Sequence, residues 1–261
     1  MTVFRHELKR GRTAWLIWAA ALSLLLAICI FLFPEMASQT DTINEMFASM
    51  GSFTSAFGMD KLDFGTLPGY FAIECGNVLG LGGALFASLL AASMLCKEEK
   101  ERTAEFLLSH PVSRTRVVAE KLAAPYAQIT ALNIAVCLVS VGSMAAVGEE
   151  VPWKSVSLLC LACFLLQCEL AAVCFGVSAF IRRGSAGIGI GAAILAYFLN
   201  IIGNIADSAK FLKYITPFGY CDGAEVVSSG KLDGIKLLVG AAFCALGIAA
   251  AFVKYRKKDI A

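Results

Sequence analysis

The stretch "AWLIWAAALSLLLAICIFLF", residues Ala14–Phe33, decides the fold class of this chain. It contains no charged residue, and a helix of about 20 residues is long enough to cross the roughly 30 Å hydrocarbon core of a bilayer. The run is too long for the apolar region of a cleaved signal peptide. We therefore interpret it as an uncleaved first membrane span.

Further apolar runs of sufficient length follow along the chain, in the approximate ranges 70–95, 122–147, 155–181, 186–206 and 236–253. The composition agrees, because 58% of the 261 residues are hydrophobic and only 16% are charged, which is far from the usage of soluble domains. We predict an all-α, polytopic membrane protein with six transmembrane helices, formed by a single domain of residues 1–261.

Basic residues fall mainly on one side of the predicted spans. Sixteen of the 22 Lys and Arg residues lie before the first span, in the segment 97–121, at Arg182 and Arg183, or in the tail after the last span. Cytoplasmic segments carry such an excess, so both termini are predicted to be cytoplasmic. The net charge of +2 hides this asymmetry and gives no indication of nucleic-acid binding.

The basic start of the chain precedes the first span. Phe4 and Leu8 are four residues apart and would share one face of a helix, which suits an N-terminal interfacial helix in the plane of the lipid headgroups. Trp15 and Trp18 would then lie at interface depth. The alternative is a basic tail that only follows the positive-inside rule.

Polar residues inside the spans are candidates for a translocation path. A charge at the bilayer centre costs at least about 2.5–3.5 kcal/mol on insertion scales, so Glu169, near the middle of the fourth span, should face protein or water, or be protonated. Gln167 lies two residues before it, and the fifth span places Tyr197, Asn200 and Asn204 on one helical face. The alternative role is interhelical hydrogen bonding, worth about 0.6 kcal/mol per contact in measured cases.

Glycines in two spans have the G-x-x-x-G spacing. They are Gly76 and Gly80 in the second span and Gly187 and Gly191 in the fifth. In lipid this spacing allows two helix backbones to approach closely. It predicts either tight packing within the chain or a seam with a second copy.

No motif for catalysis or metal binding emerges from the sequence. Cys160 and Cys163 form a C-x-x-C pair, but a zinc site needs four ligands, and His6 and His110 lie at another depth by topology. We interpret the ten cysteines as small apolar packing residues. The stretch "SSGKL", residues 228–232, lacks the glycine and the Ser or Thr of a Walker P-loop, and no hydrolase signature is present. We expect no catalytic residue, so any energy source must act from elsewhere.

Two segments on the outer side, 34–69 and 207–235, are longer than simple connections. The second holds aromatic and aliphatic residues among its charges. Such residues prefer the membrane boundary. We predict short re-entrant or interfacial helices between the fifth and sixth spans, broken at Thr216-Pro217 and at Phe218-Gly219.

The most polar passage of the chain, "EKERTAEFLLSHPVSR" at Glu99–Arg114, lies between the second and third spans. The spacing of Glu98 and Arg102 (i,i+4) and of Arg102 and Glu105 (i,i+3) favours a helix over residues 98–109 by charge pairing. The apolar residues 106–108 give this helix a stripe that a solvated loop would not need. It therefore either lies on the membrane or docks on a partner.

This passage resembles the cytoplasmic segment of the type-2 permease family of ATP-binding-cassette (ABC) transporters. The family usually has a glycine where this chain has Arg102. Two further passages resemble the family: "YITPFGYCDGAEVV" at residues 214–227 and the tail "VKYRKKDIA" at residues 253–261. The residues that carry the first resemblance are Glu99, Thr103, Glu105, Leu107, Leu108, Pro111, Ser113, Arg114 and Lys121.

The resemblance implies the permease subunit of an exporter in the cytoplasmic membrane of a bacterium. The helix after the second span would be a coupling helix that docks on a separate ATPase subunit. Two permease chains, identical or different, would pair with two ATPase chains that bind ATP and Mg²⁺. The permease itself would bind no cofactor, and its other contacts would be with membrane lipid and not with nucleic acid. The implied docking residues are Glu98, Glu101, Arg102, Glu105, Phe106 and Leu107.

Two other classes of function remain open. The first is a membrane-embedded enzyme that uses Glu169, although it would need a second acid or base at the same depth, and Glu74 lies nearer the outer end of its span. The second is a scaffold or sensor that recruits a cytoplasmic protein without transport. The substrate of an exporter cannot be predicted, because members of the family that move lipids, peptides, ions or drugs share one scaffold.

Overall fold

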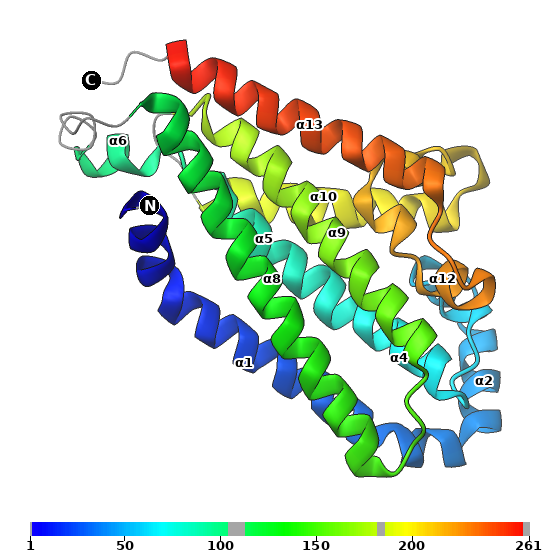
Figure 1. Ribbon diagram of the computed structural model, residues 1–261. Coiled ribbons are helices and arrows are strands. Elements are labelled where there is room, and N and C mark those ends of the chain that lie inside the picture. The colour runs from blue at the N-terminus through cyan, green and yellow to red at the C-terminus, as the bar shows by residue number, and fades with distance from the viewer. Residues whose placement is uncertain (1, 104–112, 182–185, 258–261) are drawn as a thin grey trace.

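The computed structural model describes residues 2–103, 113–181 and 186–257 (Figure 1). In these ranges the chain is helical and contains no strand. Six helices are long and apolar enough to cross a membrane. The predicted all-α fold with six spans is thereby confirmed, and the chain is a multi-pass membrane protein.

The six spans agree with the predicted ranges to within a few residues, except where polar residues continue a helix. The first and third helices begin earlier than their apolar parts, because their basic first turns are helical too. The spans are α1 (Thr2–Ser38), the combined α4 (Leu67–Cys75), η2 (Gly76–Leu81) and α5 (Gly82–Ala92), α8 (Arg114–Val147), α9 (Trp153–Ser178), α10 (Ala186–Ile205) and α13 (Gly234–Lys257).

The helices pack around α9 and α5 (Figure 1). Helix α1 lies along α8, α13 lies along α9, and α10 packs on α5. Glycines bring α9 and α13 together, since a methyl group on Gly176 would lie 2.6 Å from the carbonyl oxygen of Gly247. In the second span, η2 is a π-helical segment with a wider turn than the α-helices on either side.

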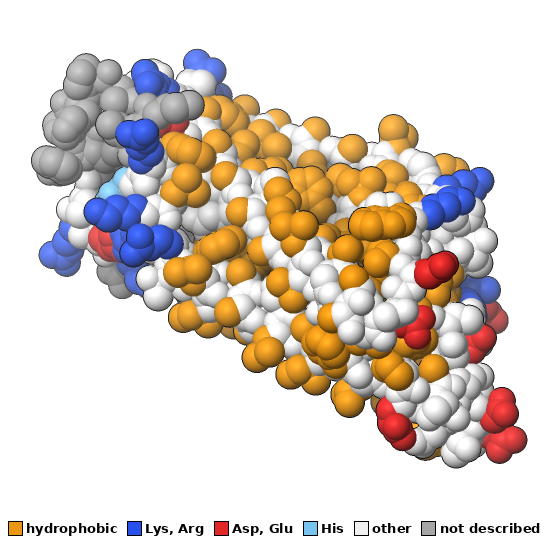
Figure 2. All heavy atoms as spheres, turned by 60° about the horizontal axis from the view of Figure 1, so that its bottom comes forward, with side chains coloured by type: hydrophobic (Ala, Val, Ile, Leu, Met, Phe, Trp, Pro, Cys, Tyr) orange, Lys and Arg blue, Asp and Glu red, His pale blue; other side chains and the backbone are white. Residues whose placement is uncertain are grey.

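Helix α1 begins, α6 (Lys97–Glu101) lies, and α13 ends at the same end of the bundle (Figure 1), which we call the basic end. Figure 2 shows Lys and Arg side chains gathered at this end and most visible carboxylates at the opposite one, with an apolar surface between them. This separation follows the positive-inside pattern. That the basic end is cytoplasmic stays a prediction.

The N-terminal segment is helical, but it is not a separate interfacial helix. Helix α1 continues from Thr2 to Ser38 and includes Pro34, which was expected in the outer segment. The sequence "RHELKRGRTAW" at residues 5–15 offers only Gly11 as a helix breaker. A single glycine costs only about 1 kcal/mol in a helix interior, which tertiary contacts can offset.

The predicted helix over residues 98–109 is wrong at Arg102. Helix α6 ends at Glu101, and Arg102 has a φ of +57°, in the left-handed region. The amide of Thr103 donates to Glu98 O (2.9 Å) and that of Arg102 to Glu99 O (3.3 Å), which is the Schellman pattern of a helix end. Glycine, which the family that this passage resembles usually has at this position, is the residue that the left-handed conformation favours.

Short helices fill the segment between the fifth and sixth spans, as predicted. They are η3 (Asp207–Ala209), α11 (Leu212–Ile215), η4 (Pro217–Tyr220) and α12 (Gly223–Ser229). The break at Thr216-Pro217 is confirmed, because Thr216 caps η4 by accepting from the amide of Phe218. The break at Phe218-Gly219 is wrong, since both residues lie inside η4 and are buried in the bundle.

The segment after α1, at the end opposite the basic end, is also helical. It contains α2 (Thr40–Ser49), α3 (Ser52–Ala56) and η1 (Met59–Lys61) before the second span begins. At the basic end, by contrast, α6 is the described element between the second and third spans.

Candidate functional site

Four charged residues join α1, α6 and α8 at the basic end, and we call them the buried charge cluster: Glu7, Lys97, Glu98 and Lys121. Glu7 of α1 pairs with Lys97 of α6, and Lys121 of α8 pairs with Glu98 of α6. The Lys121 side chain is 0% exposed, and its Nζ also donates to Met94 O at 2.6 Å. A buried ammonium is tolerated only when it is paired in this way.

More exposed contacts surround this cluster. Arg10 of α1 makes a two-pronged ion pair with Glu101 of α6, with 2.8 Å between Nη1 and Oε2. The hydrogen bonds from Arg10 lower the pKa of Glu101. Glu120 of α8 accepts from the amide of Phe4 at 3.2 Å and pairs with Arg116 at 2.9 Å. The first turns of α1 are thus attached to both α6 and α8.

The predicted docking residues are only partly described. Glu98 and Glu101 make ion pairs within the chain, and Arg102 is exposed just after the end of α6. Glu105, Phe106 and Leu107 lie outside the described residues. The docking role of all six stays a prediction. The sequence reasoning missed Glu7 and Arg10 as partners of α6, and only Lys121 was marked in advance, by the family resemblance.

Gln167 serves to join helices in the middle of the bundle. Its Oε1 accepts from Asn133 of α8 at 2.7 Å, and its Nε2 donates to Leu79 O at 3.2 Å in the π-helical segment η2. Gly83 leaves the space for this carboxamide, since a methyl group there would clash with Nε2. Gln167 thus makes interhelical hydrogen bonds, and a part for it in a path stays a prediction.

Glu169 faces the other side of α9. Residues two apart on a helix point about 200° apart, so Gln167 and Glu169 cannot share a face. The Tyr220 hydroxyl of η4 donates to Glu169 Oε2 at 2.9 Å, and Gly240 of α13 lies against the same oxygen. Glu169 is buried there, and Tyr220, a partner 51 residues away, carries no signal in the sequence.

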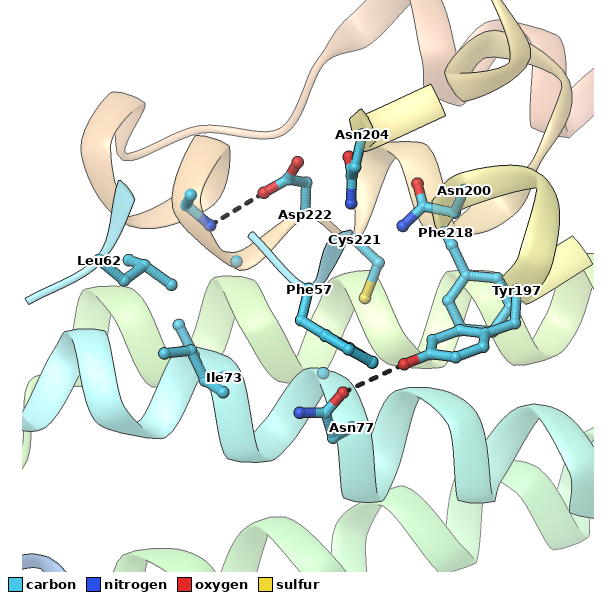
Figure 3. Close-up of a pocket in the computed structure, with 14 residues that line it drawn as sticks. Phe57, Leu62, Ile73, Asn77, Tyr197, Asn200, Asn204, Phe218, Cys221 and Asp222 are labelled. Carbon is cyan, nitrogen blue, oxygen red and sulfur yellow. Dashed lines mark hydrogen bonds between the residues drawn. The ribbon is translucent and has the colours of Figure 1, made fainter. Parts of the chain in front are cut away.

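Tyr197, Asn200 and Asn204 line one small cavity, which confirms that they share a face of α10 (Figure 3). The Tyr197 hydroxyl donates to Asn77 Oδ1 at 3.4 Å, and Asn204 donates to Ala56 O at 2.9 Å. The cavity has a volume of about 60 Å³. That space suits water rather than a substrate, because ligand pockets usually have several hundred cubic ångströms.

The five residues proposed for a path therefore lie in three separate places. Gln167 lies between α8 and η2, Glu169 between α9 and α13, and the three residues of α10 line the small cavity. A part for any of them in a translocation path stays a prediction. Each group is enclosed by neighbouring helices.

The G-x-x-x-G glycines do not make the close contacts that their spacing suggested. A methyl group on Gly76 or Gly191 would meet nothing within 4 Å, one on Gly80 would make only ordinary contact, and Gly187 is exposed. The close approach in α10 occurs at Gly189, where a methyl group would lie 2.7 Å from Ser88 O. A seam with a second copy at Gly187 and Gly191 stays a prediction.

Three cysteine thiols meet inside the bundle. Cys163 Sγ lies 3.9 Å from Cys75 Sγ and 3.4 Å from Cys221 Sγ. Cys221 follows η4 directly and is buried, although it lies in the segment that connects the fifth and sixth spans. Within the described ranges, no group of three or more His, Cys, Asp or Glu residues is arranged to hold a metal ion.

Comparison with known families gives a match over nearly the whole chain. The profile of the family described as "ABC-2 family transporter protein" matches residues 1–260. No curated protein sequence matches this chain significantly. The family match covers all six spans and both ends of the chain. Together with the six-span helical fold, it shows that the chain belongs to the ABC-2 transporter family.

Proposed function

We propose that this chain is the permease subunit of an ABC exporter, which moves its substrate across the cytoplasmic membrane with energy from a separate ATPase subunit. Family membership supports a transport role, because ABC-2 permeases generally work with an ATP-binding subunit. The observation that carries the proposal is the attachment of α6 to α1 and α8 through the buried charge cluster.

This attachment offers a way to transmit force. In our proposal the ATPase holds α6 and the residues that follow it, through Glu98, Glu101, Arg102, Glu105, Phe106 and Leu107. ATP and Mg²⁺ bind to the ATPase, and its closure moves α6. Because Lys97 pairs with Glu7 and Glu98 pairs with Lys121, a shift of α6 pulls on the first turns of two spans at once.

A second permease chain completes the transporter in this proposal. Within one chain the polar residues of the spans are enclosed in separate places, so a path through the membrane needs either a second copy or a different conformation. Helix α10 leaves Leu195, Phe198 and Ile202 exposed, and α13 leaves Leu238 and Leu246 exposed. These apolar faces suit contact with lipid or with another permease chain.

The test is purification of the tagged protein from its own membranes in mild detergent. We expect an ATPase subunit to copurify with the wild type and to be lost in Leu107→Asp. The matched control is Phe211→Asp, the same kind of change at an exposed aromatic residue of the opposite end. A folded wild-type permease that carries no ATPase, or one whose ATPase is unaffected by Leu107→Asp, would reject the docking proposal.

The rate of ATP hydrolysis distinguishes an exporter subunit from a scaffold that only recruits the ATPase. An exporter subunit should change the ATP hydrolysis rate of its ATPase when the two are reconstituted in vesicles, whereas a passive scaffold should bind the ATPase and leave that rate unchanged. Measuring hydrolysis by the ATPase alone and in the complex therefore decides between transport coupling and recruitment.

A further inference from the structure

A larger cavity opens at the basic end, apart from the small one near α10. It has a volume of about 380 Å³ and lies among α1, α5, α6 and α8, with Ala186 of α10 at its edge. This volume is in the range of small-molecule sites. Neither the family match nor the proposed coupling role assigns it an occupant.

Charged groups form part of the lining of this cavity. Arg10, Lys97 and Lys100 contribute three positive charges, and Glu7 and Glu101 two negative ones. Arg10 and Lys97 are paired with these carboxylates, whereas Lys100 is exposed and makes no ion pair with any described residue. The lining therefore carries one net positive charge, and Lys100 is free to bind an anion.

Gln128 of α8 contributes an uncharged polar group to the lining. Its side chain is only 6% exposed, and its Oε1 accepts no hydrogen bond from the described residues. A buried acceptor without a donor is rare in native structures and points to a missing partner. Gly11 of α1 makes room for this carboxamide, because a methyl group there would lie 2.5 Å from Nε2.

The cavity also has an apolar wall. Leu89, Leu90 and Met94 line it near the end of the second span, and Trp15, whose indole donates to Gln128 O at 3.0 Å, lies beside it. Tryptophan of this kind is enriched at headgroup depth. A lining that combines charged groups, an acceptor without a donor and an aliphatic wall matches an amphiphile with a polar head.

We infer that this cavity binds the headgroup of an anionic phospholipid with free hydroxyl groups, of the phosphatidylglycerol type, from the leaflet at the basic end. The phosphate lies near Lys100 and Arg10, a headgroup hydroxyl donates to Gln128 Oε1, and the acyl chains follow Leu89 and Leu90. The site does not depend on the ATPase, so it can be tested on the permease alone.

The experiment is native mass spectrometry of the delipidated full chain, titrated with phosphatidylglycerol, phosphatidylcholine or inorganic phosphate in detergent. Phosphatidylcholine has the phosphate but no hydrogen-bond donor. We expect one phosphatidylglycerol to bind, about tenfold more tightly than phosphatidylcholine, because it alone makes the bond to Gln128 and matches the net charge. Inorganic phosphate should bind far more weakly than either lipid.

Substitutions of the lining residues test whether the lipid binds in this cavity. Gln128→Leu should weaken phosphatidylglycerol binding about tenfold and abolish its preference over phosphatidylcholine. Lys100→Gln, at an exposed position where folding is not at risk, should weaken both lipids. Lys9→Gln is the matched control, since Lys9 is an exposed cation of α1 that does not line the cavity.

Two results would overturn the inference. The first is equal phosphatidylglycerol binding by the wild type, Lys100→Gln and Lys9→Gln. The second is tight binding of inorganic phosphate that depends on Lys100 and excludes the lipid, which would assign the cavity to a free phosphate. Neither result bears on ATPase copurification, so the proposed function stands or falls separately.

Discussion

The basic end and the middle of the bundle hold their helices together by different chemistry. At the basic end, α1, α6 and α8 are joined by full charges, with Lys121 buried among carboxylates. In the middle, neutral hydrogen bonds such as Asn133 to Gln167 combine with glycine contacts such as Gly176 against Gly247. Among the described residues, Glu169 makes its hydrogen bond with the Tyr220 hydroxyl and forms no ion pair with a Lys or Arg.

This difference indicates where the protein can move. Ion pairs near the membrane surface can exchange partners or take up water when a helix shifts, because water is close by. Neutral contacts between glycine backbones are short-ranged and depend on close fit. We therefore expect motion to start at the basic end and the α9–α13 contact to stay rigid.

The largest effect should come from removing the buried charge at the basic end. Lys121→Met leaves the largely enclosed Glu98, whose side chain is 14% exposed, without its ammonium and should cost about 3–5 kcal/mol of stability, measured by unfolding in detergent. Adding Glu98→Gln to this variant should restore part of the loss, since the carboxylate no longer lacks a partner. A loss below about 1 kcal/mol in the single variant would show that the cluster does not hold these helices.

The second largest effect should come from disturbing the α9–α13 contact in the middle of the bundle. Gly176→Ala puts a methyl group 2.6 Å from Gly247 O and should cost about 1–3 kcal/mol by overpacking. The control is Gly191→Ala, where a methyl group meets nothing within 4 Å, and its melting temperature in dilute detergent should stay the same or rise slightly, because alanine favours the helix. Equal stability of the two variants would contradict the close α9–α13 contact.

A smaller effect should come from replacing Arg102, whose left-handed conformation ends α6. Arg102→Gly should stabilise the end of α6 by about 1 kcal/mol, because glycine adopts the left-handed conformation without the cost of a side chain. Arg102→Ala, which removes the same charge but keeps the Cβ, is the control. Amide hydrogen exchange of residues 97–103 should slow only in the glycine variant; slowing in both would mean that the arginine side chain, not the backbone, weakens this helix end.

The smallest effect concerns pH. The lowered pKa of Glu101 means that its pair with Arg10 stabilises the folded state above the ordinary carboxyl value of 4.5 and is lost as the pH falls through the lowered value. Because both side chains are partly exposed, the effect should stay below about 1 kcal/mol and shrink with salt. Comparing wild type with Glu101→Gln between neutral and acidic pH isolates it, and an unchanged difference across that range would contradict the pairing.

The spans and the shared face of α10 could be predicted because each depends on a short stretch of sequence. A run of apolar residues sets a span, and the spacing of Tyr197, Asn200 and Asn204 sets a helical face. Partners across helices depend on which elements pack together. Nothing near Glu169 points to Tyr220, and nothing in a G-x-x-x-G spacing tells whether another helix lies opposite it.

The end of α6 is an intermediate case. Charge spacing favoured a helix through Arg102, but each carboxylate found a partner on another helix: Glu98 on α8 and Glu101 on α1. The glycine of related permeases at this position was the available signal. A glycine at this position indicates a left-handed backbone conformation that ends the helix, and Arg102 adopts that conformation here. Charge pairing within α6 did not prevent this, because Glu98 and Glu101 pair with other helices instead.

The π-helical segment η2 has a consequence for the basic end. A π-turn closes its hydrogen bond one residue later than an α-turn, so it holds an extra residue within an otherwise straight span. One residue of an α-helix corresponds to a rotation of about 100°. The extra residue in η2 therefore sets the rotation of α5 about its axis. That rotation in turn sets the direction in which Met94 O, which follows α5 in the chain, faces Lys121.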